Sequence, residues 1–492
     1  MNCKRKVLYV LAAFVLVSVT QAMADESHTR KPNIVFFLID DMGWKDLGCF
    51  GAKLYETPHI DKLCAEGMRF PQAYTSTAIC SPARATSMTG KHPMKLRMWN
   101  HHHFIPKNEK ILAQYLKEDG YQTWHVGKWH MGNPDEKTLP TDLGFDANVG
   151  GWISWAPGSY FWPYGCRLGD DGKVEPKNPR SCVPGLYKGG QKGEYLTDRL
   201  TKETLALLDN REPSKPFFLN FWHYAVHNPK QAKPRLVQKY KEKIQKLGLQ
   251  PTYRIDPKTK SKLVTSETNA VYAAMIESVD DSVGQVIAKL KQIGEYDNTF
   301  FIFYSDNGST TDTVPCVPLN GGKNSTYEAG ERVPSFMVWK EHIKRGCEYN
   351  HPIYLGDVFD TALAAAGIDK PSTHDSDGTS LLPVFAGKQL PPREFIWYFP
   401  DTRKHWAQRA NAAIYDEQSG MKYIMFFTGD ADELYDIHHD LAEQYDIVKK
   451  HPKVARELRG RLIRFLNNYY DQMPPPPEEY QSKVEARLKE TS

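Results

Sequence analysis

Several short segments of this 492-residue chain combine reactive, charged and metal-ligating side chains at spacings that could support chemistry. The most informative segment is Cys80-Ser81-Pro82-Ala83-Arg84. Because proline suits the first turn of a helix, Cys80 is expected just before a helix N-terminus, where the backbone dipole favours negative charge. Arg84 lies one turn further on and can reach the same point. The pattern predicts an anion-binding site around Cys80; a buried cysteine in front of an ordinary helix is the alternative.

Carboxylate and amide side chains follow two apolar runs of the sequence. Asp40 and Asp41 come directly after the run at 33–39, and Asp306 and Asn307 come after the run at 300–304. Two adjacent carboxylates repel each other unless a cation lies between them, although a pair of helix N-caps would also explain Asp40 and Asp41. An all-oxygen ligand set suits Ca²⁺ or Mg²⁺ rather than Zn²⁺. We therefore expect a divalent cation, with Ca²⁺ as first choice and Mg²⁺ as second.

The elements that must position these residues alternate between strands and helices. Continuous apolar runs, typical of strands buried on both faces, occur at Asn33–Ile39, Phe217–Phe221, Phe300–Tyr304 and Phe336–Trp339. Apolar stripes at helical spacing predict helices over Ala270–Ile293 and Gly356–Ala366. The alternation implies an α/β fold with a largely parallel sheet between helices. Ligands in such folds bind beyond the carboxyl ends of the strands, so the two acidic pairs are expected at one edge of the sheet.

The N-terminus has the pattern of an export signal. A short basic segment, Met1–Lys6, precedes the apolar run Val7–Val19, and Ala22-Met23-Ala24 offers a small-x-small cleavage site. The run is shorter than the roughly 20 residues that span a bilayer, so we expect cleavage near Ala24 and no stable membrane insertion. An uncleaved anchor is the alternative. The mature protein is expected in the periplasm or outside the cell.

The C-terminal part of the chain shows shorter strands. Phe395–Phe399, Ala412–Tyr415 and Tyr423–Phe427 predict a small antiparallel sheet, and an apolar stripe from Val454 to Tyr469 predicts a helix that closes it. Pro474–Pro477 then ends regular structure. We therefore divide the chain into a signal peptide (1–24), a catalytic domain (25–390), an antiparallel-sheet subdomain with its closing helix (391–473) and an extended, proline-rich tail (474–492).

The cysteine count bears on disulfide pairing, and the net charge bears on the possible binding partners. Seven of the eight cysteines remain after signal cleavage, and an odd number flags one unpaired thiol, for which Cys80 is the candidate. Spacing does not decide how the other six pair, and Cys166–Cys182 is only a weak candidate. The chain carries a net charge of +4, of which the signal removes three positive charges and leaves +1. This near-balance argues against a nucleic-acid partner.

With these segments in view, the sequence resembles the sulfatase family of the alkaline-phosphatase superfamily. The family's C-x-P-x-R motif followed by T-G is matched at Cys80, Pro82, Arg84, Thr89 and Gly90. Further matches, in family order, are GKWHMG at 127–132, DLGFD at 142–146, AVHNP at 225–229, GGK at 321–323, EAGERVP at 328–334 and ELYD at 433–436. Val226 stands where the family usually has proline, and Ala329 where it has glycine. The resemblance covers about Lys31 to Asp446 and implies an alkaline-phosphatase-like fold.

The resemblance implies a modified nucleophile and a set of roles. Cys80 would be oxidised by a formylglycine-generating or sulfatase-maturing enzyme to formylglycine (3-oxoalanine), whose hydrate attacks sulfur. The cation would be held by Asp40, Asp41, Asp306, Asn307 and the modified Cys80. Arg84, Lys128 and Lys323 would bind the sulfate. His227 would protonate the leaving alcohol and His130 would assist the second deprotonation, although the two roles can be exchanged.

The substrate is expected to be a sulfated carbohydrate. The segments 148–164 and 193–200 resemble a branch acting on sulfated galactose or N-acetylgalactosamine. Trp155 belongs to a group of aromatic residues of the kind that stack on sugars, with a structural aromatic cluster as the alternative. Asn100, His101, His102 and His103 suit sugar hydroxyls, with a solvated loop as the alternative. His223, four residues before His227, is a weaker candidate because the preceding strand opposes helical geometry there.

Two other classes of function remain open. One is a phosphomonoesterase, diesterase or phosphonate hydrolase of the same superfamily, of which the simple phosphatases typically use Ser or Thr and two Zn²⁺ ions. The other is an inactive sulfatase-like binding protein, which is expected to lack Cys80 or some metal carboxylates. Cys80 and all four metal-site residues are present in this sequence. These observations favour a sulfuric-ester hydrolase.

Overall fold

The computed structural model describes residues 30–168, 174–175, 181–183, 185–256, 262–311, 313–401 and 409–489. The expected signal peptide, residues 1–24, lies outside the described residues. Within the part of the chain that is described, no helix is both long and apolar enough to span a membrane.

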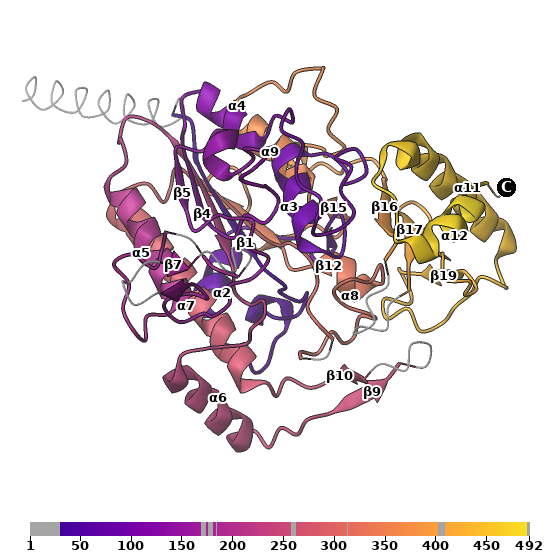
Figure 1. Ribbon diagram of the computed structural model, residues 1–492, viewed down its shortest axis with the longest axis horizontal. Helices are drawn as coiled ribbons and strands as arrows, with labels where there is room; N and C mark the ends of the chain where they lie inside the picture. Colours follow the sequence, from indigo (N-terminus) through magenta and orange to yellow (C-terminus); the bar gives the residue numbers. More distant parts are fainter. Residues whose placement is uncertain are drawn as a thin grey trace, which may run out of the picture.

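A sheet of eight strands forms the centre of the molecule (Figure 1). Its strand order is β14-β2-β13-β11-β1-β8-β4-β5. Five neighbouring strands are parallel: β11 (Thr299–Ser305), β1 (Asn33–Ile39), β8 (Phe217–His223), β4 (Gln122–Gly127) and β5 (Ala147–Val149). The antiparallel strand β13 (Phe336–Trp339) then leads to β2 (Met68–Arg69) and β14 (Cys347–Glu348). The mixed, mostly parallel sheet expected from the sequence is confirmed.

The two faces of this sheet are covered by different helices. Alternate residues of β1 face opposite sides: Val35, Phe37 and Ile39 join one core, and Ile34, Phe36 and Leu38 join the other. The first core includes α2 (Pro58–Cys64), α5 (Leu196–Asp209), α6 (Pro234–Lys246) and α7 (Ala270–Gln292). The second includes α3 (Cys80–Thr89), α4 (Leu112–Glu118), α9 (Asp357–Ala365) and α10 (Leu382–Phe385). The result is a three-layer α/β/α arrangement.

Smaller elements complete the N-terminal region. A three-stranded sheet, β12-β3-β15, contains Arg332–Val333, Ala73–Tyr74 and Ile353–Tyr354. Two hairpins contain β6 (Arg167–Leu168) with β7 (Val174–Glu175), and β9 (Tyr253–Ile255) with β10 (Lys262–Val264). Short helical turns are η1 (Gly48–Phe50), η2 (Pro140–Leu143) and α8 (Glu328–Glu331).

The C-terminal region is a second, antiparallel sheet. Its strands are β16 (Glu394–Phe399), β17 (Asn411–Asp416), β18 (Met421–Phe426) and β19 (Glu433–Asp436), in that order. One face packs against α11 (Pro452–Tyr469), as the apolar stripe predicted. The other face carries Trp397 and Tyr435, which share a core with Tyr74 of β3. This sheet therefore links its own helices, seen at the right of Figure 1, to the main body.

The expectation of an extended tail after Pro477 is wrong. Residues Glu478–Lys489 form helix α12, which follows the short turn η4 (Tyr470–Gln472). Val484 and Leu488 lie one turn apart on this helix and are buried in the same core as α11. The four prolines end α11 and its turn, but apolar residues at helical spacing begin a new helix beyond them.

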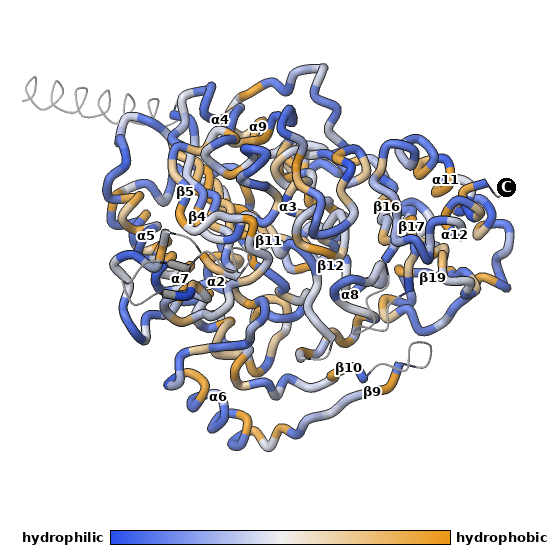
Figure 2. Tube along the Cα trace, in the orientation of Figure 1, coloured by the Kyte–Doolittle hydropathy of each residue, from blue (hydrophilic) through white to orange (hydrophobic). Residues whose placement is uncertain are grey.

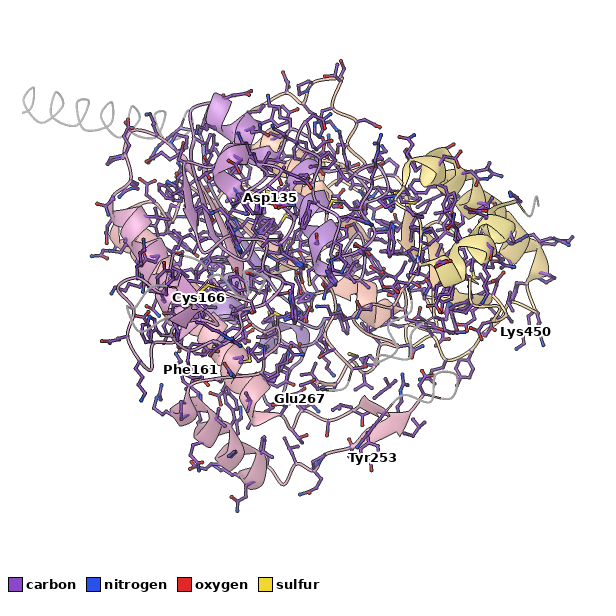
Figure 3. The ribbon with its side chains drawn as sticks, viewed as in Figure 1. Asp135, Phe161, Cys166, Tyr253, Glu267 and Lys450 are labelled. Carbon is purple, nitrogen blue, oxygen red and sulfur yellow. A yellow bond between two sulfur atoms is a disulfide. The ribbon has the colours of Figure 1, made fainter. Side chains whose placement is uncertain are left out.

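Cys166 and Cys182 form a disulfide, so this pairing is confirmed (Figure 3). The remaining described cysteines, which are Cys49, Cys64, Cys80, Cys316 and Cys347, are not in disulfides. Cys80 is thus one of the described cysteines that has a free thiol.

Candidate active site

The ends of β1 and β11 bring the predicted acidic residues together. The two strands are parallel neighbours with Ile39 opposite Ser305, so the residues that follow leave the sheet at one edge. The Asp41 amide donates to Asp306 Oδ1 at 3.2 Å, and Asn307 Nδ2 donates to Asp41 Oδ1 at 2.8 Å. The expected meeting of the two pairs at one edge is therefore observed.

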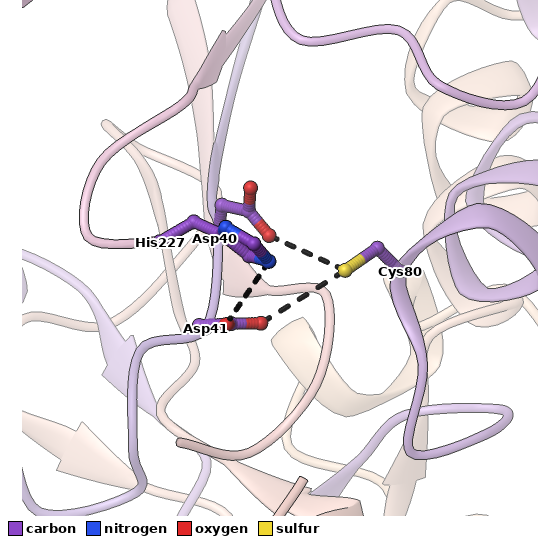
Figure 4. A group of neighbouring side chains, drawn as sticks. All are labelled: Asp40, Asp41, Cys80 and His227. Carbon is purple, nitrogen blue, oxygen red and sulfur yellow. Dashed lines mark hydrogen bonds and ion pairs between the residues drawn. The ribbon is translucent and has the colours of Figure 1, made fainter. Parts of the chain in front are cut away.

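Cys80 faces this acidic group from the first residue of α3. The sequence placed Cys80 just before the helix; it is instead the first helical residue, with Pro82 in the first turn. Its Sγ lies 3.4 Å from Asp40 Oδ1 and 3.9 Å from Asp41 Oδ1 (Figure 4). Burial, followed by the charge of Asp306, raises the pKa of the thiol well above its usual value. The encoded thiol is thus held protonated and is a poor nucleophile in this setting.

The same group has the chemistry of a cation site. Ligand atoms of Asp40, Asp41, Cys80 and His227 all lie within 4.8 Å of one another. Asp41 Oδ2 and Asn307 Oδ1 are buried and accept no hydrogen bond from the described residues. A buried carboxylate oxygen without a donor is costly unless a cation compensates it. The donor set fits a hard divalent cation held mainly by oxygen.

Both carboxylate oxygens of Asp306 accept hydrogen bonds, unlike those of Asp41. Its Oδ1 accepts from the Asp41 amide, and its Oδ2 accepts from Arg84 Nε at 2.8 Å. Arg84 is fully buried on α3, and its Nη1 also donates to the Lys128 carbonyl at 2.8 Å. Asp306 therefore both borders the cation site and fixes the guanidinium of Arg84.

Two lysines contact the carboxylates from different loops. Lys128 follows β4, and its Nζ donates to Asp40 Oδ2 at 2.6 Å. Its position depends on Gly127, which has a φ of 99° and lies so close to the Trp222 carbonyl that a Cβ would approach within 1.8 Å. Lys323 Nζ donates to Asp41 and to Cys80 Sγ, the latter at 3.2 Å. Both ammonium groups thus lie beside the point where an anion would meet Cys80.

The charges around Asp41 control its ionisation. Burial alone would raise the pKa of Asp41, but the opposing charges of Lys323 and Lys128 outweigh it and hold that pKa well below its usual range. Asp41 is therefore ionised at neutral pH. An ionised, buried carboxylate is what a cation site needs.

His227 and His130 reach the site from the loops after β8 and β4. His227 Nε2 lies 3.5 Å from Asp41 Oδ2, while its Nδ1 contacts the Asn228 carbonyl at 2.9 Å. A carbonyl only accepts, so Nδ1 carries the hydrogen and Nε2 presents its lone pair to the site. Burial, and then the charge of Lys323, lower the pKa of His227 well below its usual value. The His130 ring stacks on His101 at a centroid distance of 5.2 Å.

A cavity of about 320 Å³ leads to these groups. Its lining residues are Asp41, Cys80, His101, His102, Phe104, His130, Ile153, Trp155, His227, Asn228, Thr310, Lys323 and Asn324. The aromatic ring of Trp155 is half exposed at 49% and meets the His227 ring edge-on at 5.7 Å. Of the expected sugar-binding residues, His101, His102 and Trp155 are therefore at the cavity.

Three other candidates have different positions. Asn100 accepts a hydrogen bond from the His102 amide at 2.8 Å, and His103 accepts one from the Trp99 amide at 3.2 Å. Neither lines the cavity, so both shape the loop. His223 is wrong as a substrate residue. It is the last residue of β8, and its Nε2 meets Ser282 of α7 at 2.9 Å within the sheet–helix core.

Sequence reasoning missed five lining residues: Phe104, Ile153, Asn228, Thr310 and Asn324. Asn228 and Asn324 are adjacent to His227 and Lys323, so proximity to matched motifs was a usable signal. Phe104 and Ile153 carry ordinary apolar side chains, and nothing in their type distinguishes them from core residues.

Comparison with known proteins agrees with this geometry. The family model "Sulfatase" matches residues 32–368, and the model "N-sulphoglucosamine sulphohydrolase, C-terminal" matches residues 322–468. Human N-acetylgalactosamine-6-sulfatase is 31% identical over 403 residues, covering 76% of this chain and 69% of that protein. N-acetylgalactosamine-6-O-sulfatase of Bacteroides thetaiotaomicron is 26% identical, covering 88% of this chain and 93% of that protein.

A solved structure extends the similarity to nearly the whole fold. The structure of Ps i-CgsB in complex with k-i-k-neocarrahexaose has a TM-score of 0.73 and 28% sequence identity, covering 94% of this chain and 97% of that one. Residues of four matched motifs, Cys80, His130, His227 and Lys323, line one cavity, and the family model covers more than half of the sequence. The chain belongs to the sulfatase family and is a sulfuric-ester hydrolase.

Proposed function

We propose that this sulfatase removes O-sulfate from a carbohydrate, a sulfated galactose or N-acetylgalactosamine unit of a glycan. The observation that carries the proposal is the cavity of about 320 Å³, which has Cys80 and Lys323 among its lining residues and Trp155 and His102 beside them. This volume is at the lower end of the usual range for small-ligand sites, and it suits about one sugar with its sulfate. The names of the relatives, two N-acetylgalactosamine sulfatases and a protein in complex with neocarrahexaose, support this substrate class.

The proposal includes formylglycine made from Cys80 and a bound Ca²⁺, with Mg²⁺ as second choice. Asp40, Asp41, Asp306 and Asn307 would hold the cation with the modified side chain. Hydrated formylglycine supplies an oxygen nucleophile for sulfur, and the cation lowers the pKa of that oxygen and neutralises sulfate charge. The orphaned oxygens Asp41 Oδ2 and Asn307 Oδ1 support the cation, and the position of Cys80 beside these carboxylates supports its role as the modified residue.

The chain's own cations bind and orient the sulfate. Lys128 and Lys323 stand on either side of the acidic pair, and each contacts a different carboxylate. Arg84 is held by Asp306 and by the Lys128 carbonyl, so its planar group is fixed before substrate arrives. Preorganised charges of this kind stabilise the charge that develops on the sulfate oxygens during transfer.

The two histidines move protons. His227 keeps its Nδ1 hydrogen on the Asn228 carbonyl, so only Nε2 can take up a proton and pass it to the departing sugar oxygen. His130 is buried beside Lys128, and both effects favour its neutral form, which suits a base. We assign His227 to the leaving group and His130 to the step that regenerates the aldehyde.

The proposal also includes how Cys80 is modified and where the enzyme works. A formylglycine-generating or sulfatase-maturing enzyme would act on Cys80 before the chain folds, because the folded thiol is fully buried. The N-terminal segment would direct export to the periplasm or beyond, with cleavage near Ala24.

Two measurements test the proposal. The first is a desulfation screen of the purified enzyme against defined sulfated galactose, N-acetylgalactosamine and glucosamine sugars. Release of sulfate from the first two is expected; turnover of phosphonate or phosphate esters alone would contradict it. The second is the mass of the peptide that contains Cys80, expected to be about 18 Da lighter than the encoded form, from the change of a thiol to an aldehyde. An unmodified peptide in an active preparation would rule out formylglycine.

A further inference from the structure

A basic arm projects from the layered core. We use this name for Lys233, α6 (Pro234–Lys246), the link that follows it and the hairpin of β9 and β10, residues 233–256 and 262–264. In Figure 1 the arm runs along the lower edge of the molecule, outside the three layers. Figure 2 shows hydrophilic and hydrophobic residues alternating along α6. The function described above uses none of these residues.

The charge of the arm is strongly one-sided. Residues 233–246 contain six Lys or Arg and a single acidic residue, Glu242, in a chain whose total net charge is only +4. Lys233, Lys239 and Lys243 pair with carboxylates of the main body. The other three, Arg235, Lys241 and Lys246, are exposed and form no ion pair with the described residues. The paired lysines hold the helix in place, while the unpaired ones leave a positive field facing solvent.

The arm also contains a groove with an aromatic wall. A cavity of about 690 Å³ lies between α6 and the hairpin, and its lining includes Lys241, Ile244, Tyr253 and Lys262. Tyr253, labelled in Figure 3 on the hairpin, is 56% exposed, and Lys262 Nζ lies 3.7 Å from its ring centroid. The exposed part of the ring offers apolar surface to a sugar, and the ammonium groups of Lys241 and Lys262, which form no ion pair with the described residues, offer charge to sulfate. This combination suits a sulfated sugar better than an apolar peptide.

The hairpin is attached to the loop that carries catalytic-cavity residues. The Val264 amide donates to the Thr311 carbonyl at 3.0 Å, and Arg254 donates to Asn320 Oδ1 at 3.0 Å. Thr310 lines the catalytic cavity and Thr313 lines the groove. Three residues of chain span at most about 11 Å, a length that one or two sugar units can cover. The two hollows are therefore close enough for one oligosaccharide to enter both.

We propose that the groove of the basic arm is a second binding site for the sulfated glycan, which holds sugars next to the unit whose sulfate is being removed. The inference rests on the proposed carbohydrate substrate. It assigns to Lys241 and Lys262 the binding of neighbouring sulfates and to Tyr253 the packing against a sugar ring. Sulfated oligosaccharides then bind more tightly than the sulfated monosaccharide, and the difference falls with added salt.

The test compares two groove variants with a matched control. The first groove variant is Lys241→Ala combined with Lys262→Ala, and the second groove variant is Tyr253→Ala. The control is Lys246→Ala, which removes an equally exposed, unpaired charge of the same helix that does not line the groove. KM is measured for sulfated monosaccharides and for oligosaccharides of increasing length from chondroitin sulfate and carrageenan. The groove variants are expected to raise KM for the longer substrates about fivefold to tenfold, as for two exposed charges, with kcat and monosaccharide kinetics unchanged.

Binding is measured separately from catalysis. Retardation in native gels containing either polysaccharide is expected for the wild-type protein and for Lys246→Ala, and is expected to be lost in the groove variants. Equal retardation of all variants, or oligosaccharide kinetics unaffected by the groove changes, would overturn the proposal. Binding of the arm to anionic phospholipid vesicles but to neither polysaccharide would also overturn it. If no sulfated sugar is a substrate at all, the proposed function fails, whereas the gels still report on the groove.

Discussion

Opposite charges are matched one to one in the active site. Asp40, Asp41 and Asp306 provide three carboxylates, and Arg84, Lys128 and Lys323 provide three cations, all of them buried. Buried charges persist only when they are paired, so this balance allows the site to form as the chain folds. A divalent cation would then leave the site with an excess of two positive charges. The site would become attractive to a sulfate ester at the moment the cation is bound.

The two lysines can be tested directly. Lys128→Ala and Lys323→Ala are each expected to lower kcat/KM by on the order of 10² or more, because each removes a preorganised charge from the transferring sulfate. The measurement is steady-state kinetics with the substrate found in the screen. Formylglycine content should be unchanged in both variants, which separates loss of sulfate binding from loss of maturation. Kinetics equal to those of the wild type would show that the lysine does not contact sulfate.

Removal of the bound cation tests the assignment of the metal-binding residues. Chelation is expected to abolish activity and to lower Tm, because a ligand that binds only the folded state stabilises it. Ca²⁺ should restore both properties, and Mg²⁺ should restore them less well. Stoichiometric Zn²⁺ found by elemental analysis of the active enzyme would contradict the oxygen-ligand assignment.

At the scale of elements, sequence patterns located the strands well and the loops poorly. Strands β1 and β11 were predicted almost to the residue, because both run through the centre of the sheet and are apolar throughout. Helix α12 was missed because four prolines precede it and its apolar residues are sparse. His223 was misplaced because strand alternation, which turns it toward α7, outweighs its spacing from His227. Loop positions such as Thr310 depend on tertiary contacts that no local pattern encodes.

Strand β18 carries a buried charge that joins the C-terminal sheet to helix α8. Lys422 is fully buried and pairs with Glu328 of α8 at 2.9 Å and with Glu443 at 3.1 Å. We expect Lys422→Met to lower the free energy of unfolding by about 3–5 kcal/mol, since it leaves the buried Glu443 without its lysine partner and Glu328 with Arg332 as its remaining cation. Chemical denaturation provides the measurement. Lys388→Met, at an exposed position, is the control and should change little. An equal effect of both substitutions would show that the buried pairs contribute nothing specific.

The C-terminal sheet is hydrogen-bonded to segments of the main body that lie next to the active-site residues. Trp397 Nε1 donates to the Thr75 carbonyl at 2.9 Å, and Thr326 donates to Asn411 Oδ1 at 2.6 Å. Thr326 lies three residues after Lys323, so the C-terminal sheet fixes the loop that carries this lysine. The two family models overlap at 322–368, across the same junction. Loss of the C-terminal region is therefore expected to disturb the active site, although none of its described residues lines the cavity.

We expect recognition of sulfate and recognition of sugar to be divided between the depth and the rim of the cavity. Sulfate is the same tetrahedral anion in every substrate, and fixed, buried charges around Cys80 suit it. Sugars differ in the orientation of their hydroxyls, so loop residues beside the opening suit them. Trp155 and His102 are such residues, and both line the cavity. His103 belongs to the same loop as His102 but packs on Trp99, at a ring distance of 5.2 Å.

We therefore expect Trp155→Ala and His102→Ala to lower kcat/KM on the sulfated glycan by about tenfold or more, the effect of one lost polar or aromatic contact of roughly 1.4 kcal/mol, while activity on a small aryl sulfate changes far less. The aryl sulfate uses the same buried cations but does not reach the rim. His103→Ala is the matched control: it removes a neighbouring imidazole that shapes the loop, so it should lower Tm and reduce both activities in equal proportion. Parallel losses on both substrates for Trp155→Ala and His102→Ala, with a lowered Tm, would assign these residues to loop packing and remove them from substrate recognition.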